Sequence, residues 1–346
     1  MSNAHLDTSE SRSPANEKQG RTADSDMPRM LGLLASGDAL TGPDLASKLG
    51  ISRAAVWKQI ETWRSAGLEI DSGVHGYRLP HRLEPLHADR IRAGLPTGAR
   101  RRIGVLENHW RLDSTSSELA RRAADLPDLS FVFADWQQAG RGRRGRQWLS
   151  PPATNLQFSC LKRFASGYAA LCGLSLAAGI AAAQALEDCG VRGIALKWPN
   201  DLVHDDAKLG GILVELGGEF MGPCHAIIGI GINVHLSDTV RAALGRPCAD
   251  LTSLLGGMAP SRNALAAALI ARLVDALDAF DAAGFAAFTH AWAGRDALAG
   301  RRVRVEGAHG TFDGIAANVD ARGALQVRTD EGMRVIDSAE VTVRPE

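Results

Sequence analysis

The chain has 346 residues, enough for two or three domains that each bury a core. Its 39 basic and 39 acidic residues balance, which excludes a global charge that would attract nucleic acid or a membrane. Its five cysteines are scattered without a C-x-x-C pair, which argues against a zinc site and against a disulfide framework. Because the sequence has neither a membrane-length apolar run nor a signal pattern, we expect a cytoplasmic protein without a membrane partner.

The N-terminal part predicts a tail followed by three helices. Residues 1–26 have no aromatic side chain and are rich in Ser, Asn, Asp and Glu, so we expect a disordered tail. A first helix is expected around residues 30–34. A second spans residues 42–49 and stops at Gly50, and a third runs from Ser52, a favourable N-cap, to about Arg64.

Two short strands between residues 68 and 79, joined by a glycine-bearing turn, are typical of a wing. Residues 27–80 are therefore expected to form a winged helix-turn-helix, with the helix-turn-helix itself over 42–61 and its third helix in the DNA major groove. The alternative is a small helical domain used only for packing. The residues expected to face DNA are Ser52, Arg53, Trp57 and Lys58. Since few of them are charged, one copy would bind weakly and a dimer is needed.

A mixed α/β domain is expected over residues 86–297, after a proline-bounded linker. Apolar runs predict strands over 131–134, 156–161, 194–198, 202–204, 209–216 and 226–233. An alanine- and leucine-rich run over 168–189 predicts a buried helix, and a second long helix is expected from Ser261 to about Ala282. Residues 298–346 contain short alternating runs that predict a small closed, SH3-like β-barrel. The expected fold class is thus α+β with three domains.

An arginine-rich loop is the most specific local feature. It places Arg141, Arg143, Arg144 and Arg146 among glycines. Because like charges about 4 Å apart repel by about 4 kcal/mol at an effective dielectric of about 20, the cluster suits a ligand with carboxylate or phosphate oxygens. The loop also fits the dinucleotide pattern G-x-G-x-x-G. That motif requires a helix at its third glycine, whereas Pro151 and Pro152 follow here, so we exclude it.

Four short motifs occur in order: Asp113 to Ser116, Gln137 to Gly145, Lys197 to Asp201 and Lys208 to Glu215. Between the two flanking domains, they resemble the motifs of bifunctional biotin protein ligases, which also repress the biotin operon. The resemblance implies that biotin and ATP, with Mg²⁺, form biotinyl-5′-AMP. A lysine of a biotin carrier domain, of the acetyl-CoA carboxylase type, then accepts the biotin. Operator DNA and a ligand-promoted homodimer are also implied. We expect no permanently bound metal, since the cysteines are scattered.

The first step brings a carboxylate against a triphosphate, so the site must supply positive charge. Lys197 lies in an otherwise apolar predicted strand, where an unpaired ammonium would cost several kcal/mol; the alternative is a lysine facing solvent. Arg143, on a loop able to cover the ligand, is the second catalytic candidate; the alternative is a solvated basic loop. By resemblance, biotin and its adenylate contact Ser114, Thr115, Ser116, Gln137, Arg141, Gly142, Arg143 and Lys197.

Weaker candidates lie in or near the same motifs: Asn200, Asp201, Lys208, Gly210, Gly211, Gly231 and Asn233. Asp201 would hold Mg²⁺ or orient the incoming amine, or it would only cap a turn. The glycines permit close approach of a ligand, or they mark strand bulges. The hydroxyls of residues 114–116, ahead of a helix expected over 117–124, suit the ureido ring of biotin or serve only as N-caps.

The sequence departs from the family pattern at two places. Ser116 stands where the family usually has Asn, and residues 237–255 contain no aromatic side chain where the bifunctional relatives carry an adenine-stacking Trp. Two alternative functions share parts of this architecture. A biotin-sensing transcription factor with weak ligase activity shares every domain, but Lys197 and the arginine loop favour the enzyme. A lipoate ligase is not expected to carry this loop or the winged helix.

Overall fold

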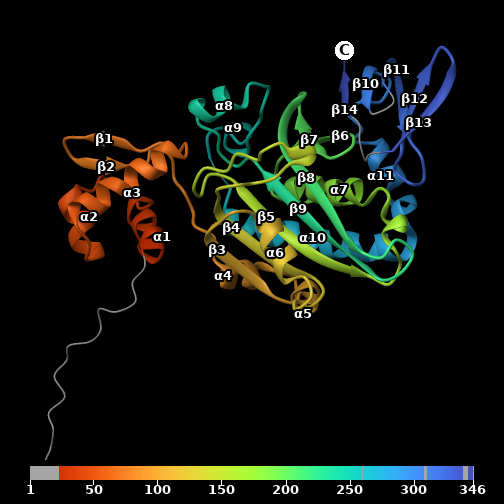
Figure 1. Cartoon of the computed structure of the whole chain (residues 1–346). Coiled ribbons are helices and arrows are strands. Elements are labelled where there is room, and N and C mark those ends of the chain that lie inside the picture. The colour runs from red at the N-terminus through yellow and green to blue at the C-terminus, as the bar shows by residue number, and fades with distance from the viewer. Residues whose placement is uncertain (1–22, 259, 308–309, 338–341, 346) are drawn as a thin grey trace, which may run out of the picture.

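The computed structural model describes residues 23–258, 260–307, 310–337 and 342–345. The winged helix and the C-terminal sheet lie on opposite sides of the central domain (Figure 1). Most of the tail expected over residues 1–26 falls outside the described residues, and its last four positions belong to the first helix. Among the described residues, no helix combines the length and hydrophobicity needed to cross a bilayer.

The winged helix contains α1 (Ala23–Leu34), α2 (Gly42–Leu49), α3 (Arg53–Ser65), β1 (Asp71–Gly73) and β2 (Gly76–Arg78). α1 begins earlier than expected because Met27 is also buried, one turn before Met30. The predictions for α2 and α3 are confirmed: Gly50 ends α2 with a φ of 67°, and the Ser52 hydroxyl accepts a hydrogen bond from Ala55 N at 3.1 Å.

The wing begins later than the sequence pattern suggested. Leu68 and Ile70 are buried in the core of the domain, and the first strand starts at Asp71. Gly76 is required at the turn because its φ is 107° and a Cβ there would lie 2.2 Å from the carbonyl oxygen of Leu40. Val74, at the tip, is 94% exposed.

The central domain is built on one mixed sheet in the order β3-β4-β5-β9-β8-β7-β6. Only the β3–β4 pairing is parallel among the strand pairs of this sheet in the described residues. The strands are β3 (Leu106–Leu112), β4 (Ser130–Gln137), β5 (Leu156–Phe164), β6 (Ala195–Lys197), β7 (Asp201–His204), β8 (Ala207–Gly218) and β9 (Cys224–Ile232). All six strands predicted for this domain are found, and β3 had no predicted counterpart.

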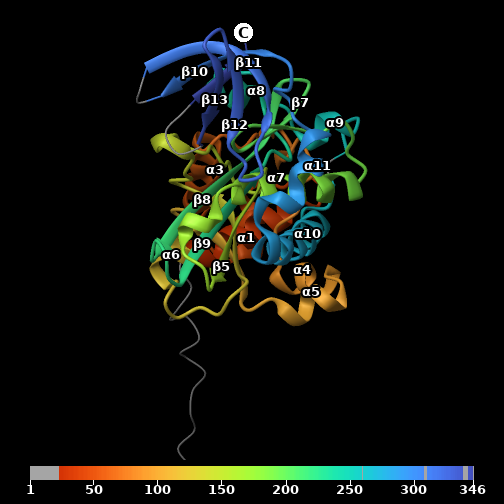
Figure 2. The same cartoon turned by 90° about the vertical axis from the view of Figure 1, so that its right-hand side faces the viewer.

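Helices cover the two faces of this sheet unequally. The main core lies between the sheet and α4 (Ala88–Gly94), α7 (Leu174–Asp188) and α10 (Arg262–Ala283). α6 (Thr115–Arg122) packs on the opposite face, as Figure 2 shows at its left. The helix expected over 168–189 begins only at Leu174. Gly173 breaks it, with a φ of 82° and with the Phe285 side chain 2.7 Å from where its Cβ would lie.

The winged helix shares a core with the central domain. Trp63 of α3 meets Trp110 of β3 edge to face, with ring centroids 5.9 Å apart, and Trp136 and Ala153 join the same cluster. The intervening linker is also fixed. Leu83 is buried in this cluster.

A buried polar network holds the end of that linker. The Glu84 carboxylate accepts hydrogen bonds from Arg262 N and from the Ser261 hydroxyl, which is the N-cap of α10. The Arg262 guanidinium donates to Glu84 O at 2.6 Å and pairs with Asp135 of β4 at 2.7 Å, with both charged side chains buried. The start of α10 therefore ties the linker to the central sheet.

The C-terminal strands form one antiparallel sheet in the order β13-β12-β11-β10-β14. They are β10 (Arg302–Gly307), β11 (Gly310–Val319), β12 (Leu325–Thr329), β13 (Gly332–Ile336) and β14 (Thr342–Pro345). Within the described ranges, β13 and β14 do not pair with each other, so the expected closure of a barrel is not seen there. Trp198 Nε1 donates to Gly323 O at 3.1 Å and links this sheet to the central domain.

Candidate functional site

A cavity of about 460 Å³ opens on the face of the central sheet opposite α7 and α10. Its floor follows from the alternation of β9. Ile228, Ile230 and Ile232 belong to the main core, so the positions between them face the other side. Those positions are Gly229 and Gly231, and both line the cavity. Glycines on one face of an otherwise apolar strand thus leave room for a ligand.

One end of the cavity is neutral and polar, at the start of α6. Thr115 N donates to Gln137 Oε1 at 2.8 Å, and the Thr115 hydroxyl lies 2.8 Å from the Ser159 hydroxyl. Ser116 contacts the same Ser159 hydroxyl at 2.9 Å. Ser114 is the N-cap residue, but its side chain makes no capping hydrogen bond. The interpretation of these hydroxyls as helix caps alone is therefore not supported.

Two buried polar atoms of lining residues have no hydrogen-bond partner among the described residues. They are Gln157 Oε1 on β5 and Trp148 Nε1. The Gln157 amide donates to Ala134 O at 2.7 Å, which fixes the side chain. The Trp148 ring lies against Gly231, where a Cβ would be 2.6 Å from the ring. Since buried polar groups are normally paired, these two atoms favour a polar ligand.

The arginine loop closes over the other end of the cavity. Its backbone is tightly folded: Gly142 N donates to Arg146 O at 2.7 Å, and Trp148 N to Gly140 O at 2.9 Å. Arg144 and Gly145 have φ values of 57° and 69°. The short 3-10 turn over Arg143–Gly145 replaces the helix that a dinucleotide motif would need, which agrees with its exclusion.

The loop arginines contact the strands beyond them. Arg141 pairs with Glu215 of β8 at 2.6 Å, and Arg143 donates to Asn200 Oδ1 at 3.4 Å. The pKa of Arg143 is lowered from its usual range by burial, against the opposing effect of Asp201, and the neighbouring arginines lower it further. An anion placed here would relieve that cost.

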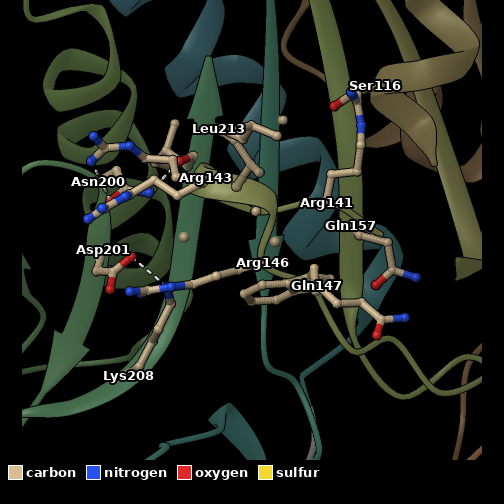
Figure 3. A pocket seen from close by; sticks show the side chains of 18 of the residues that line it. Ser116, Arg141, Arg143, Arg146, Gln147, Gln157, Asn200, Asp201, Lys208 and Leu213 are labelled. Atoms are coloured by element: carbon tan, nitrogen blue, oxygen red, sulfur yellow. Dashed lines mark hydrogen bonds and ion pairs between the residues drawn. The ribbon is translucent and has the colours of Figure 1, made fainter. Parts of the chain in front are cut away.

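Two lysines complete this cationic end. Lys197, the last residue of β6, lines the cavity. Its pKa is lowered by burial, with Asp201 and Asp206 acting in the opposite direction. Lys208 forms a short ion pair with Asp201 and also has a lowered pKa, first because of burial. Figure 3 shows Asn200, Asp201 and Lys208 on one side of the cavity, and Ser116 and Gln157 on the other.

The structure brings most of the predicted site residues together. The lining includes Ser114, Thr115, Ser116, Gln137, Arg141, Gly142, Arg143, Lys197, Asn200, Asp201, Lys208, Gly211 and Gly231. Gly210 and Asn233 do not line it. Gly210 faces the core side, against Ile232 and Leu202, and the Asn233 amide donates to Lys208 O and Ala249 O. These two positions therefore have packing and backbone-tethering roles.

The sequence patterns did not single out Gln147, Gln157 and Arg246, which line the cavity, or Ser159, which contacts two of the lining hydroxyls. Gln157 and Ser159 lie on β5, which is buried on both faces, so its pattern does not tell one face from the other. Arg246 lines the cavity from the segment after β9 that lacks aromatic residues. The signal that could have found the β5 pair is the run Gln157-Phe-Ser159, in which polar residues alternate with a core phenylalanine.

The candidate DNA-facing residues lie together at the start of α3. Ser52, Arg53, Trp57 and Lys58 are all exposed, and Trp57 is 59% exposed despite its size. Val56 and Ile60, on the other face of the helix, are buried in the domain core. α3 thus presents one polar and aromatic face outward, as a recognition helix does.

Comparison with known proteins finds a matching family for each of the three parts of the chain. The biotin/lipoate A/B protein ligase family matches residues 110–233, the biotin protein ligase C-terminal domain 299–344, and an HTH domain 29–78. The bifunctional ligase/repressor BirA of Salmonella typhimurium is 36% identical over 91% of this chain and 96% of that protein. The Escherichia coli BirA is also 36% identical, with the same coverage.

A solved structure is also similar to this chain. The biotin protein ligase from Aquifex aeolicus in complex with biotin and ATP is 26% identical, with a TM-score of 0.60, and covers 69% of this chain and 98% of that chain. The matches to the two BirA proteins cover more of this chain, 91% in each case. The chain belongs to the family of bifunctional biotin protein ligases, the ligase/repressors of the BirA type.

Proposed function

We propose that the central domain activates biotin with ATP and transfers the biotinyl group to a lysine of a biotin carrier domain. The observation that carries this proposal is the polarity of the cavity. Hydroxyls and unpartnered buried polar atoms occupy one end, and lysine and arginine side chains occupy the other. Biotin has a neutral ureido ring at one end and a carboxylate at the other, which matches this division.

In the first step, a carboxylate oxygen of biotin attacks the α-phosphorus of ATP, and the bond to pyrophosphate breaks. Both reactants are anions, so their approach needs fixed positive charge. Lys197 and Arg143 supply it, since their lowered pKa values mark ammonium and guanidinium groups held with little water. The arginine loop covers the adenylate and slows its hydrolysis.

In the second step, the ε-amino group of the carrier lysine attacks the carbonyl carbon of the adenylate. The amide bond forms, AMP leaves, and the amine loses a proton. Among the described residues that line the cavity, Asp201 is the only carboxylate, and it is engaged with Lys208. Asp201 orients the incoming amine in this proposal, and its ion pair with Lys208 holds the carboxylate in place.

Mg²⁺ enters with ATP as part of the substrate. The donor set fits a weakly held ion, because Mg²⁺ is commonly bound by one or two carboxylates together with substrate phosphates. Asp201 is the residue that would contact it, and the metal would neutralise phosphate charge. Arg246, the planar cation on the segment over residues 237–255, is the side chain that we place beside the adenine, since guanidinium groups stack on aromatic rings.

The test is to incubate the full chain with biotin, ATP, Mg²⁺ and a biotin carrier domain and to measure the intact mass of the carrier. We expect one biotinyl group per carrier and release of pyrophosphate. A biotin-sensing regulator without useful ligase activity would bind biotin but leave the carrier mass unchanged. That outcome would overturn the proposed enzyme and leave the winged helix as the functional part.

We propose further that the winged helix binds operator DNA as a homodimer promoted by the adenylate. A single recognition helix offers few positive charges, and two-fold symmetry places two such helices on half-sites one or more DNA turns apart. Arg53→Ala is expected to weaken DNA binding and to reduce the salt dependence by about one counterion. Sedimentation and mobility-shift titrations with biotin alone, ATP alone and both test it; equal dimerisation in all three would exclude the ligand-dependent switch.

A further inference from the structure

Two histidines and a glutamate meet where the winged helix joins the central domain. Glu69 follows α3, His81 follows β2, and His235 follows β9 of the central sheet. One ligand atom from each lies within 4.8 Å of the other two. The His81 and His235 rings have centroids 4.0 Å apart, and His81 Nε2 is 3.6 Å from Glu69 Oε2.

His235, the less exposed of the two histidines, has a ring nitrogen without a partner in the described part of the chain. This nitrogen, Nε2, is itself buried. It lies in a small cavity between the domains, with Leu68, Leu79 and Thr154 in its walls. A buried ring nitrogen beside a second imidazole and a carboxylate forms a ligand set for Zn²⁺, which binds imidazole nitrogen and carboxylate oxygen.

The surroundings of His235 disfavour protonation of its ring. Burial, His81 and Arg241 lower the pKa of His235 to about 4, so the ring is neutral at pH 7 and its lone pair is available. Arg241 opposes a cation here, but its guanidinium is paired with the carboxylate of Asp250. The Glu69 carboxylate supplies negative charge on the open side.

We propose that Glu69, His81 and His235 bind one Zn²⁺ ion that fixes the winged helix against the central domain. Ligand atoms around tetrahedral Zn²⁺ lie roughly 3.3–3.5 Å apart, as its bond lengths of about 2.0–2.2 Å require. The 3.6 Å separation of His81 and Glu69 is near this value, and the other ligand-atom separations, all within 4.8 Å, must shorten when the ion binds. A fourth position is left for water. The expectation of no bound metal rested on the scattered cysteines and did not consider these three residues, which are far apart in the sequence.

This site would act on the DNA-binding part without touching the cavity. The Ser237 hydroxyl near His235 donates to Gly67 O at 3.5 Å, so the same junction already has a weak polar contact between the domains. A bound metal would replace that weak contact with bonds to both domains. It should therefore change the orientation and stability of the winged helix and leave carrier biotinylation unchanged.

The experiment is a calorimetric titration of the chelator-stripped full-length protein with zinc chloride. We expect one site per chain, and losing a ligand should cost at least the 10- to 100-fold that losing an outer-shell partner costs in known metal sites. His81→Ala changes a half-exposed side chain, which should leave folding intact, and His235→Ala changes the less exposed one. His290→Ala, an exposed histidine of α11 (Thr289–Ala293), is the matched control.

Two further measurements separate the metal site from a structural effect. Zn²⁺ should raise the Tm of the parent and of His290→Ala in a concentration-dependent way, and should not raise that of His81→Ala. Co²⁺ in place of Zn²⁺ should give the visible bands of a tetrahedral nitrogen- and oxygen-ligated ion. The proposal is overturned if the parent takes up no Zn²⁺, or if His81→Ala and His235→Ala both bind it as the parent does.

Discussion

The two ends of the cavity are prepared for their ligand in different ways. At the neutral end, Thr115 and Ser116 of α6 both contact the hydroxyl of Ser159 on β5. At the cationic end, Arg141 and Lys208 are paired with the carboxylates of Glu215 and Asp201. The hydroxyl network of the neutral end is therefore formed before a ligand arrives, whereas an anion at the cationic end must compete with acids of the protein.

This difference separates recognition from chemistry. Rigid, short side chains select a ring by shape and hydrogen bonding at little cost in conformational entropy. Charges that are partly neutralised in the free protein can turn towards a charge that develops during the reaction. Changes at the cationic end should therefore lower the rate most, and changes at the neutral end should mainly weaken biotin binding.

The largest effect is expected from Lys197→Gln. Removing a charge that stabilises the reacting anions should lower the rate of pyrophosphate release by about 10²- to 10³-fold, the usual cost of losing one such group. Biotin binding should change little. Single-turnover measurement with Lys48→Gln, an exposed lysine of α2, as control would check it. Undiminished adenylate formation would remove Lys197 from the catalytic residues.

The pH dependence of the parent sharpens the same point. Burial lowers the pKa of Lys197, so its ammonium form is lost at a lower pH than for an ordinary lysine. Because the charged form is the active one, adenylation should be fully present below that lowered pKa and should fall as the pH rises through it. The alkaline decline should disappear in Lys197→Gln. A decline that is identical in both proteins would assign it to another group.

Arg143→Ala should have the next largest effect. It removes a charge-assisted contact that is typically worth about 1.5–3 kcal/mol, or about 10- to 150-fold. The adenylate should also escape to solvent faster, because the loop loses its hold on Asn200. Retention of labelled adenylate on a desalting column measures this. Arg90→Ala, which changes an exposed arginine of α4, is the control. An intermediate held as long as in the parent would contradict a covering role for the loop.

Gly231→Ala tests the floor between the two ends. The new Cβ would lie 2.6 Å from the Trp148 ring, so the ring must move towards the ligand. Overpacking of this kind costs about 1–3 kcal/mol, and biotin affinity should fall by about tenfold. Titration calorimetry would measure it against Gly98→Ala, where no atom lies within 4 Å of the added Cβ. Equal affinity in the two variants would show that Trp148 is free to yield.

The smallest effect is expected from Ser159→Ala. This hydroxyl links Thr115 to Ser116, and its loss should weaken biotin binding by about two- to tenfold without altering the chemical step once biotin is bound. Ser130→Ala removes another buried hydroxyl, on β4, that bonds to Pro127 O away from the cavity. It should reduce stability without weakening biotin. A larger fall in kcat than in affinity for Ser159→Ala would break the comparison between the two ends.

Local rules allowed much of the fold to be predicted from the sequence. Gly50 and Ser52 fix the ends of α2 and α3 through interactions within a few residues, and both predictions are confirmed. The break at Gly173 was missed because it depends on Phe285, a residue distant in the sequence that occupies the space beside it.

The candidate site was predictable where charge and glycine stand out against an apolar background. The arginine loop and Lys197 do so, and they come together in the cavity. Gln157, Ser159 and Arg246 do not stand out in the sequence in this way. Their roles depend on which face of β5 lies towards the cavity and on how the segment over residues 237–255 folds. Gly210 and Asn233 belong to the predicted motifs but do not line the cavity.

The core that joins Trp63 to Trp110 and Trp136 has a consequence for how the protein unfolds. Since neither domain buries these rings alone, the winged helix and the central sheet should melt in one calorimetric transition. A cut after residue 80 would leave Trp110 and Trp136 facing water, and the truncated enzyme would be prone to aggregate. A winged helix from another protein could therefore replace this one only if its own apolar side chains covered Trp110 and Trp136.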